Sequence, residues 1–106
     1  MSQPAYLIIQ LKVKDFQKYL DQYGRPVFSQ LSKLGAEFLV TSAEAEILEG
    51  EWFGNWTVLI RFPSRETAIE WYESGDYAPL KSARIKELTT GGNMILLPGR
   101  ESDSSK

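Results

Sequence analysis

The chain has 106 residues, a formal net charge of -2, and acidic and basic residues that are mixed along its length. This length fits one domain with one core, and no basic stripe is present for a nucleic acid to bind. The chain has no cysteine and no histidine, which excludes disulfides, thiolate and Ser-His nucleophiles, and histidine-held zinc or haem.

The first expected element is a β-strand over residues 5–13, in which apolar residues alternate between two faces. Asp15 stands where a helix N-cap belongs, and apolar residues at helical spacing then predict a long amphipathic helix. Gly24 and Pro26 interrupt this pattern, so we expect a kink or a restart there. The helix is expected to end at Leu34, before a glycine in the left-handed conformation.

A second strand is expected over residues 37–41, with residues 45–48 continuing it or forming an edge strand after a bulge. Residues 56–62 alternate again and predict the third strand. Ser64 then caps a helix that is expected to run as far as Gly75.

Asp76 is expected to cap one more helical segment, which the glycine pair at 91–92 ends. Residues 93–98 predict the last strand. We therefore expect one domain over residues 1–99, followed by a polar tail at 100–106 that frays.

The element order β-α-β-β-α-β favours an α+β fold, the ferredoxin-like plait, with a four-stranded antiparallel sheet and the helices on one face. Val58 and Ile60 place apolar side chains on one face of this sheet, but Leu59 and Ile8 point to the other face. A monomer would leave that second apolar face exposed. We therefore expect a homodimer that packs sheet to sheet.

The sequence contains no pattern typical of a membrane segment or of a metal site. No segment approaches the ~20 apolar residues of a membrane span, and the N-terminus leads into a strand without the pattern of a signal peptide. We therefore expect a cytoplasmic protein. Glu44, Glu46, Glu49 and Glu51 form an acidic cluster, but their spacing fits no calcium loop, so we expect neither a metal nor a cofactor.

Five motifs cover most of the chain. They are Asp15-Phe16-x-x-Tyr19-x-x-x-Tyr23, Gly35-x-x-Phe38-Leu39-Val40, Ile47-Leu48-Glu49-Gly50-x-Trp52, Phe62-Pro63-Ser64 and Trp71-Tyr72-x-Ser74-x-x-Tyr77-x-Pro79-Leu80-x-x-x-Arg84. Together they resemble the family named domain of unknown function 1330, in the dimeric α+β barrel superfamily.

The resemblance covers residues 5–99 and implies the ferredoxin-like plait and a sheet-to-sheet dimer, but no established reaction. The superfamily includes cofactor-free monooxygenases, haem enzymes, muconolactone-isomerase-like proteins and ligand-sensing domains. Many of them hold a small molecule between the sheet and the helices. Because this chain has no histidine, it departs from the pattern of the haem-binding members.

Arg84 is the first candidate site residue, because it lies on a largely apolar helix face where a charge needs a partner. It is either an anion clamp for a ligand or half of a salt bridge to an acid such as Asp15 or Glu73. Tyr19 and Tyr23 stand one helical turn apart, and they either line a pocket or pack in the core.

Trp71 and Tyr72 are the remaining candidates, as core residues or as walls of the same pocket. The favoured function is a small-molecule-binding domain, with these four aromatic residues around the ligand and Arg84 as its polar anchor. One alternative is a cofactor-independent enzyme, similar to a monooxygenase or an isomerase, acting on a small aromatic or acidic metabolite. The other is a structural dimer with no ligand. The sequence assigns no catalytic residue.

Overall fold

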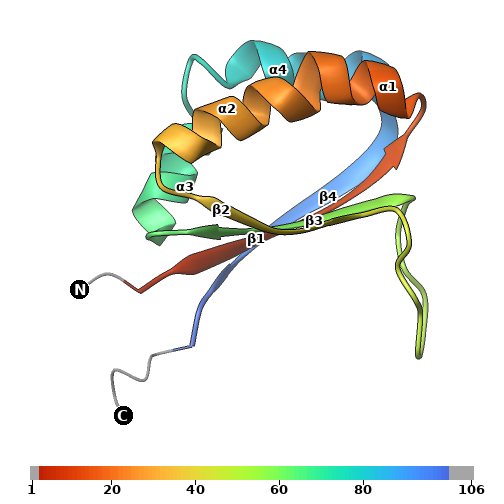
Figure 1. The fold of residues 1–106 in the computed structure, drawn as a ribbon, viewed down its shortest axis with the longest axis horizontal. Coiled ribbons are helices and arrows are strands. Elements are labelled where there is room, and N and C mark those ends of the chain that lie inside the picture. Colours follow the sequence, from red (N-terminus) through yellow and green to blue (C-terminus); the bar gives the residue numbers. More distant parts are fainter. Residues whose placement is uncertain (1–2, 101–106) are drawn as a thin grey trace.

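Four strands form one antiparallel sheet in the order β2-β3-β1-β4, in a computed structural model that describes residues 3–100. The strands are Ala5–Val13 (β1), Glu37–Ser42 (β2), Trp56–Phe62 (β3) and Thr89–Pro98 (β4). The helices lie together on one face of the sheet, and the other face is bare (Figure 1). This arrangement confirms the predicted α+β fold, a ferredoxin-like plait.

The alternation of side chains along the strands explains the two layers. In β1 the odd-numbered residues are buried beneath the helices, while the even-numbered residues are half-buried or exposed. In β3 the same alternation buries Val58, Ile60 and Phe62. We call the side covered by the helices the inner face, and the bare side the outer face.

The regular hydrogen bonding of the first helix is interrupted, as expected, but the chain stays helical throughout. It consists of α1 (Phe16–Tyr19), a π-helical segment η1 (Leu20–Gly24) and α2 (Arg25–Lys33). Asp15 caps the start by accepting a hydrogen bond from the backbone N–H of Lys18 at 3.1 Å. A proline at the start of α2 has no N–H to donate, so the regular helical hydrogen bonding cannot continue there and the helix widens into a π turn.

The second helical region follows β3 and consists of three pieces. They are α3 (Arg65–Tyr72), α4 (Ala78–Ala83) and a second π-helical segment, η2 (Arg84–Leu88). Ser64 caps α3 as predicted, because its side chain accepts from the backbone N–H of Thr67 at 3.1 Å.

Two details of this region differ from the prediction. Helix α3 ends at Tyr72, before Gly75, and the expected cap at Asp76 is wrong. The hydroxyl of Ser74 accepts from the backbone N–H of Tyr77 at 3.2 Å, so it holds the turn where the aspartate was expected to act.

The prediction for the last strand was also too short. Strand β4 begins at Thr89, and the glycine pair at 91–92 lies inside it, where it was expected to end the helix. The hydroxyl of Thr89 donates to the carbonyl of Arg84 at 2.8 Å, which closes η2 before the strand starts.

Residues 43–55 form neither helix nor strand, so the expected strand at 45–48 is wrong. We call this segment the arm, and it extends beyond the sheet on the side away from the helices (Figure 1). Gly54 anchors its base with a φ of +85°, and a Cβ there would lie 2.3 Å from the carbonyl oxygen of Leu11. The Asn55 side chain accepts from the N–H of Val13 and donates to its carbonyl, at 2.8 and 3.1 Å.

The core lies between the inner face and the helices, where Leu11, Leu31, Ile60, Phe62 and Tyr77 are fully buried. Among the described residues no helix is long and apolar enough to cross a membrane. The polar tail predicted over residues 100–106 lies outside the described residues except for Arg100, which is exposed and forms neither helix nor strand.

Candidate functional site: an apolar cleft between sheet and helix

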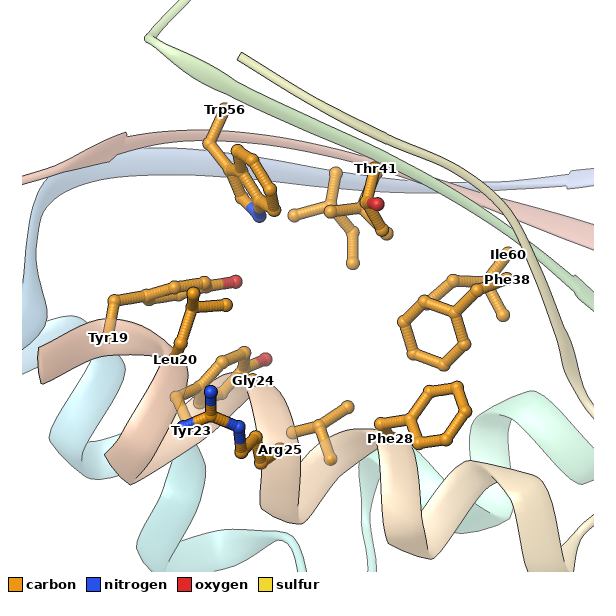
Figure 2. A pocket seen from close by; sticks show the side chains of 13 residues that line it. Tyr19, Leu20, Tyr23, Gly24, Arg25, Phe28, Phe38, Thr41, Trp56 and Ile60 are labelled. Carbon is orange, nitrogen blue, oxygen red and sulfur yellow. The ribbon is translucent and has the colours of Figure 1, made fainter. Parts of the chain in front are cut away.

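A cavity of about 530 Å³ opens between the inner face and the interrupted first helix (Figure 2). We call it the cleft. The sheet contributes Ile9, Phe38, Thr41, Trp56, Val58 and Ile60, and the helix contributes Tyr19, Leu20, Tyr23, Gly24, Arg25, Val27 and Phe28.

Aromatic rings form most of the walls. The Trp56 ring lies on the sheet side, with its centroid 5.4 Å from that of Phe16 and 6.3 Å from that of Tyr19. Phe28 and Phe38 face each other at the opposite end, with centroids 5.2 Å apart (Figure 2). The open space between these two ends suits a flat ligand, because rings on several sides offer stacking and edge contacts.

The π turn determines which side chains reach the cleft. Tyr19 and Tyr23 lie on the inner side of the turn and line the cleft. The hydroxyl of Tyr19 points toward the open centre (Figure 2), whereas that of Tyr23 is paired with the hydroxyl of Tyr77. Gly24 follows at the end of η1, where an added Cβ would lie 3.2 Å from Cδ2 of Leu20. The glycine therefore keeps the helix side of the cleft wide.

Both phenols are held in their neutral form. Burial raises the pKa of Tyr19 far above its usual value, and the nearby Trp56 indole and Arg84 charge oppose this only in part. Burial also raises the pKa of Tyr23, with a further contribution from Tyr77, while Arg84 lowers it. Because neither phenol ionises at neutral pH, they can donate or accept hydrogen bonds there but cannot act as general bases.

A polar link lies behind the cleft. The hydroxyl oxygens of Tyr23 and Tyr77 are 2.6 Å apart and buried. The guanidinium carbon of Arg84 lies 5.8 Å from the centroid of the Tyr23 ring. Burial lowers the pKa of Arg84, but the Tyr23 and Tyr77 phenols outweigh this effect and the pKa is raised overall, so the arginine stays charged.

The structure divides the five predicted site residues among three places. Tyr19 and Tyr23 line the cleft. Tyr72 and Arg84 line a different cavity of about 510 Å³ beside β4, which we call the second cavity. Trp71 is absent from both linings.

Trp71 has a packing position between the two helical regions. Its indole N–H donates to the side-chain oxygen of Gln30 at 2.9 Å, and its ring centroid is 4.1 Å from that of Tyr77. Gln30 in turn donates to the backbone carbonyl of Asp76 at 3.0 Å. These contacts tie α2 to the turn between α3 and α4.

The salt bridge that was weighed for Arg84, to Asp15 or Glu73, is not formed. Within residues 3–100 the ion pairs are Arg25 with Asp21 and Arg61 with Glu37, all of them solvent-exposed side chains. No group of three or more acidic side chains in that range is placed to hold a metal ion.

Several cleft residues were missed by the sequence analysis. Trp56 and Phe38 lie on the inner strand face, which the alternation identifies, but that pattern does not separate a cavity wall from solid core. Phe28 gives no helical signal because it follows the buried Val27, and it is 55% exposed. A large aromatic at the edge of an amphipathic face was the only clue to its position.

The chain belongs to the family described as Domain of unknown function (DUF1330), which it matches over residues 4–100. No curated protein matches it. A protein of unknown function from Rhodopseudomonas palustris, RPA0582, has a similar structure, with a TM-score of 0.75 and 13% identity over 96% of this chain and 86% of that chain.

Two other solved structures share the architecture. A mutant of SnoaB, a cofactor-independent oxygenase from Streptomyces nogalater, matches with a TM-score of 0.65 and 13% identity over 95% of this chain and 97% of that chain. A dimeric protein of unknown function and ferredoxin-like fold from Bacteroides fragilis matches with a TM-score of 0.59 and 9% identity over 91% and 96%. At these identities the likeness shows the fold alone.

Proposed function

We propose that this protein binds a small, flat and largely apolar molecule in the cleft. The observation that carries the proposal is a cavity of about 530 Å³ whose walls are aromatic and aliphatic side chains. Ligand pockets in proteins commonly measure roughly 300–1,000 Å³ and combine apolar walls with a few polar groups. A structural dimer without a ligand would be expected to fill this space with side chains.

The polar groups of the cleft limit what the ligand carries. The Tyr19 and Tyr23 hydroxyls suit one hydroxyl or carbonyl group on an otherwise apolar ring system. Arg25 lies at the rim, but its charge is paired with Asp21 at the surface. The cleft therefore favours a neutral ligand over an anion.

Fluorescence titration with 2-naphthol tests the proposal, because Trp56 lines the cleft and reports on a bound ring. We expect saturable quenching in the wild type. Thr41→Phe is expected to weaken binding by about tenfold or more, since Thr41 is exposed at the cleft and a ring there occupies ligand space. The control Thr41→Val keeps the size of the side chain and should bind as the wild type does. Equal binding by all three proteins would sink the proposal.

We further propose that two copies pair through the outer face. Strand register aligns four apolar side chains across the bare face, namely Val40, Leu59, Ile8 and Ile95. Ile95 is 51% exposed in the single chain. A second copy of this face offers the same apolar row, so pairing would bury both.

Polar residues next to this row supply a rim for the interface. The neighbouring row contains Ser42, Thr57, Gln10 and Asn93, and Asn93 donates to Gln10 at 3.2 Å. The arm reaches the same face, because the Trp52 indole donates to the Thr57 hydroxyl at 3.0 Å. Leu48, at 89% exposure, lies on this arm and is available to a partner.

Analytical ultracentrifugation tests the pairing. We expect a dimer for the wild type and a folded monomer for Leu59→Glu, because the new charges would meet across a two-fold interface. The control Lys33→Glu changes charge on the exposed end of α2, away from the outer face, and should remain dimeric. A monomeric wild type would overturn this part of the proposal.

Cofactor-independent chemistry on an ionisable substrate is the second candidate function. The Tyr23–Tyr77 hydroxyl pair, with the charged Arg84 behind it, could donate toward the oxyanion of a substrate that has released its proton to solvent, since the phenols of the cleft do not act as bases. The absorbance of bound 2-naphthol separates the two functions. Binding alone predicts that the neutral naphthol persists at neutral pH, whereas catalysis of this kind predicts the naphtholate.

Four sequence-based expectations stay predictions within this proposal. They are a single domain over residues 1–99, a cytoplasmic location, the absence of a cofactor and the absence of a nucleic-acid partner. Fractionation of cells that express the chain tests the location, and absorbance spectra of the purified protein test the cofactor.

A further inference from the structure

The second cavity differs from the cleft in chemistry as well as in place. It lies beside β4, beneath η2 and the end of α3, and measures about 510 Å³. Its lining includes Arg84, the hydroxyl-bearing Thr89 and Thr90, and the backbone of the glycine pair at 91–92. No acidic side chain lines it.

Arg84 is the only charged side chain in this lining, and it is deeply buried. It is 6% exposed, and its Nε is a buried donor that has no hydrogen-bond partner among the described residues. Neither ion pair found within residues 3–100 involves it. A buried charge without a counter-ion carries a desolvation cost that is offset only when an opposite charge is nearby.

The neighbours of Arg84 do not supply that opposite charge. Tyr23 and Tyr77 are the groups that raise the pKa of Arg84, and burial keeps the Tyr23 phenol neutral. The Nζ of Lys81 lies 4.2 Å from the centroid of Tyr72, but Lys81 is outside the lining of the cavity. Among the lining residues the charge of Arg84 therefore has no acidic partner.

Local structure keeps the guanidinium in place and accessible from the cavity. The Thr89 hydroxyl donates to the Arg84 carbonyl at 2.8 Å and thereby holds the backbone of η2. A Cβ at Gly92 would lie 2.5 Å from Cδ2 of Leu11 and 3.7 Å from Nη1 of Arg84. Glycine at this position therefore leaves free the space next to the guanidinium.

We propose that the second cavity binds a small organic carboxylate, with Arg84 as its counter-ion. The planar guanidinium matches a carboxylate with two parallel hydrogen bonds. Tyr72 and Ile85, on the walls of the cavity, contact the apolar part of the ligand. A single guanidinium with apolar walls suits a monoanion with a hydrocarbon body better than a phosphate dianion.

Calorimetric titration tests this site with sodium benzoate, and with benzyl alcohol and inorganic phosphate as comparison ligands. We expect saturable benzoate binding, and benzyl alcohol, whose neutral hydroxyl suits the cleft, should not compete with benzoate at the second cavity. Arg84→Met should weaken benzoate binding by about tenfold or more, because the charge-assisted hydrogen bonds are lost. Arg84→Lys keeps the charge without the planar fork and should fall between the two. Phosphate binding as tight as benzoate binding would overturn the carboxylate assignment.

A surface variant keeps the test independent of folding. Ile85 lines the cavity and is 54% exposed, so a substitution there leaves the core intact. Ile85→Glu places a carboxylate at the cavity and should abolish benzoate binding, whereas the uncharged Ile85→Gln loses only an apolar contact and should weaken binding far less. Thr41→Phe, which occupies the cleft, should leave benzoate binding unchanged. Benzoate affinity that is lost in Thr41→Phe but kept in Arg84→Met would overturn the proposal, since the probe would then occupy the cleft.

Discussion

The cleft and the second cavity open from the same helix–sheet interface but have opposite chemistry. The cleft lies beside β2 and β3, with aromatic walls and neutral phenols, whereas the second cavity lies beside β4 and contains the buried Arg84. The Tyr23–Tyr77 hydroxyl pair lies between these two environments. One plait can therefore separate an apolar site from a charged one with a pair of buried side chains.

Truncating Tyr77 should have the largest effect on this separation. Tyr77 is fully buried, and its ring packs on those of Trp71, Tyr72 and Tyr23. Tyr77→Ala is expected to lower the free energy of unfolding by about 3–5 kcal/mol, as for other buried aromatic residues. Urea denaturation measures the loss. The control Leu48→Ala, on the exposed arm, should change stability by less than about 0.5 kcal/mol.

Alkaline pH should have the second-largest effect, because it ionises the phenols of Tyr19 and Tyr23 in the unfolded chain. An unfolded tyrosine loses its proton near pH ~10, but burial keeps Tyr19 and Tyr23 protonated in the fold by raising their pKa. The stability that these phenols contribute is therefore complete below this pH and is lost as the pH rises above it. We expect a loss of about 1.4 kcal/mol per pH unit for each phenol.

Urea denaturation at increasing pH measures that slope. Tyr19→Phe removes one of the two phenols and should reduce the slope by about one half. If the slope of this variant equals that of the wild type, Tyr19 does not titrate as its burial requires.

Loss of the hydrogen bond between the Tyr23 and Tyr77 hydroxyls should have an intermediate effect on stability. Tyr23→Phe or Tyr77→Phe leaves the other hydroxyl buried without this partner, and each is expected to cost about 1–3 kcal/mol. The double variant removes both hydroxyls and should cost less than the sum of the single variants. A double-mutant cycle measures the difference, and additive costs would show that the two hydroxyls are not coupled.

Narrowing the cleft alone should have the smallest effect on stability. Gly24 has helical dihedrals, φ -58° and ψ -50°, so Gly24→Ala is expected to stabilise the fold by up to about 1 kcal/mol. The new methyl group would lie near Leu20 and reduce the space for a ligand. We expect weaker 2-naphthol binding and unchanged benzoate binding. Loss of both would show that the two cavities are not independent.

The local parts of this architecture could be predicted from the sequence. Alternation in residues 5–13 and 56–62 located two strands and both sheet faces. The spacing of Tyr19 and Tyr23 placed both on the inner side of the first helix. These features depend on periods of two and 3.6 residues, which a sequence shows directly.

The rest depends on contacts between distant segments. The sequence predicts one pocket for Arg84, Tyr19 and Tyr23, but the position of β4 gives Arg84 a separate cavity. It also predicts a helix stop at the glycine pair 91–92, whereas the pairing of β4 with β1 draws this pair into the strand. Both outcomes depend on the register of β4 and on the path of η2. Neither of these produces a periodic pattern that could be recognised in the sequence.

A crystal structure of the protein grown with 2-naphthol tests most directly whether the cleft is a binding site. We expect the naphthalene ring between Trp56 and the Phe28–Phe38 pair, with its hydroxyl within hydrogen-bond distance of Tyr19 or Tyr23. A cleft closed by its own side chains, or a ligand bound only elsewhere on the molecule, would contradict binding in the cleft.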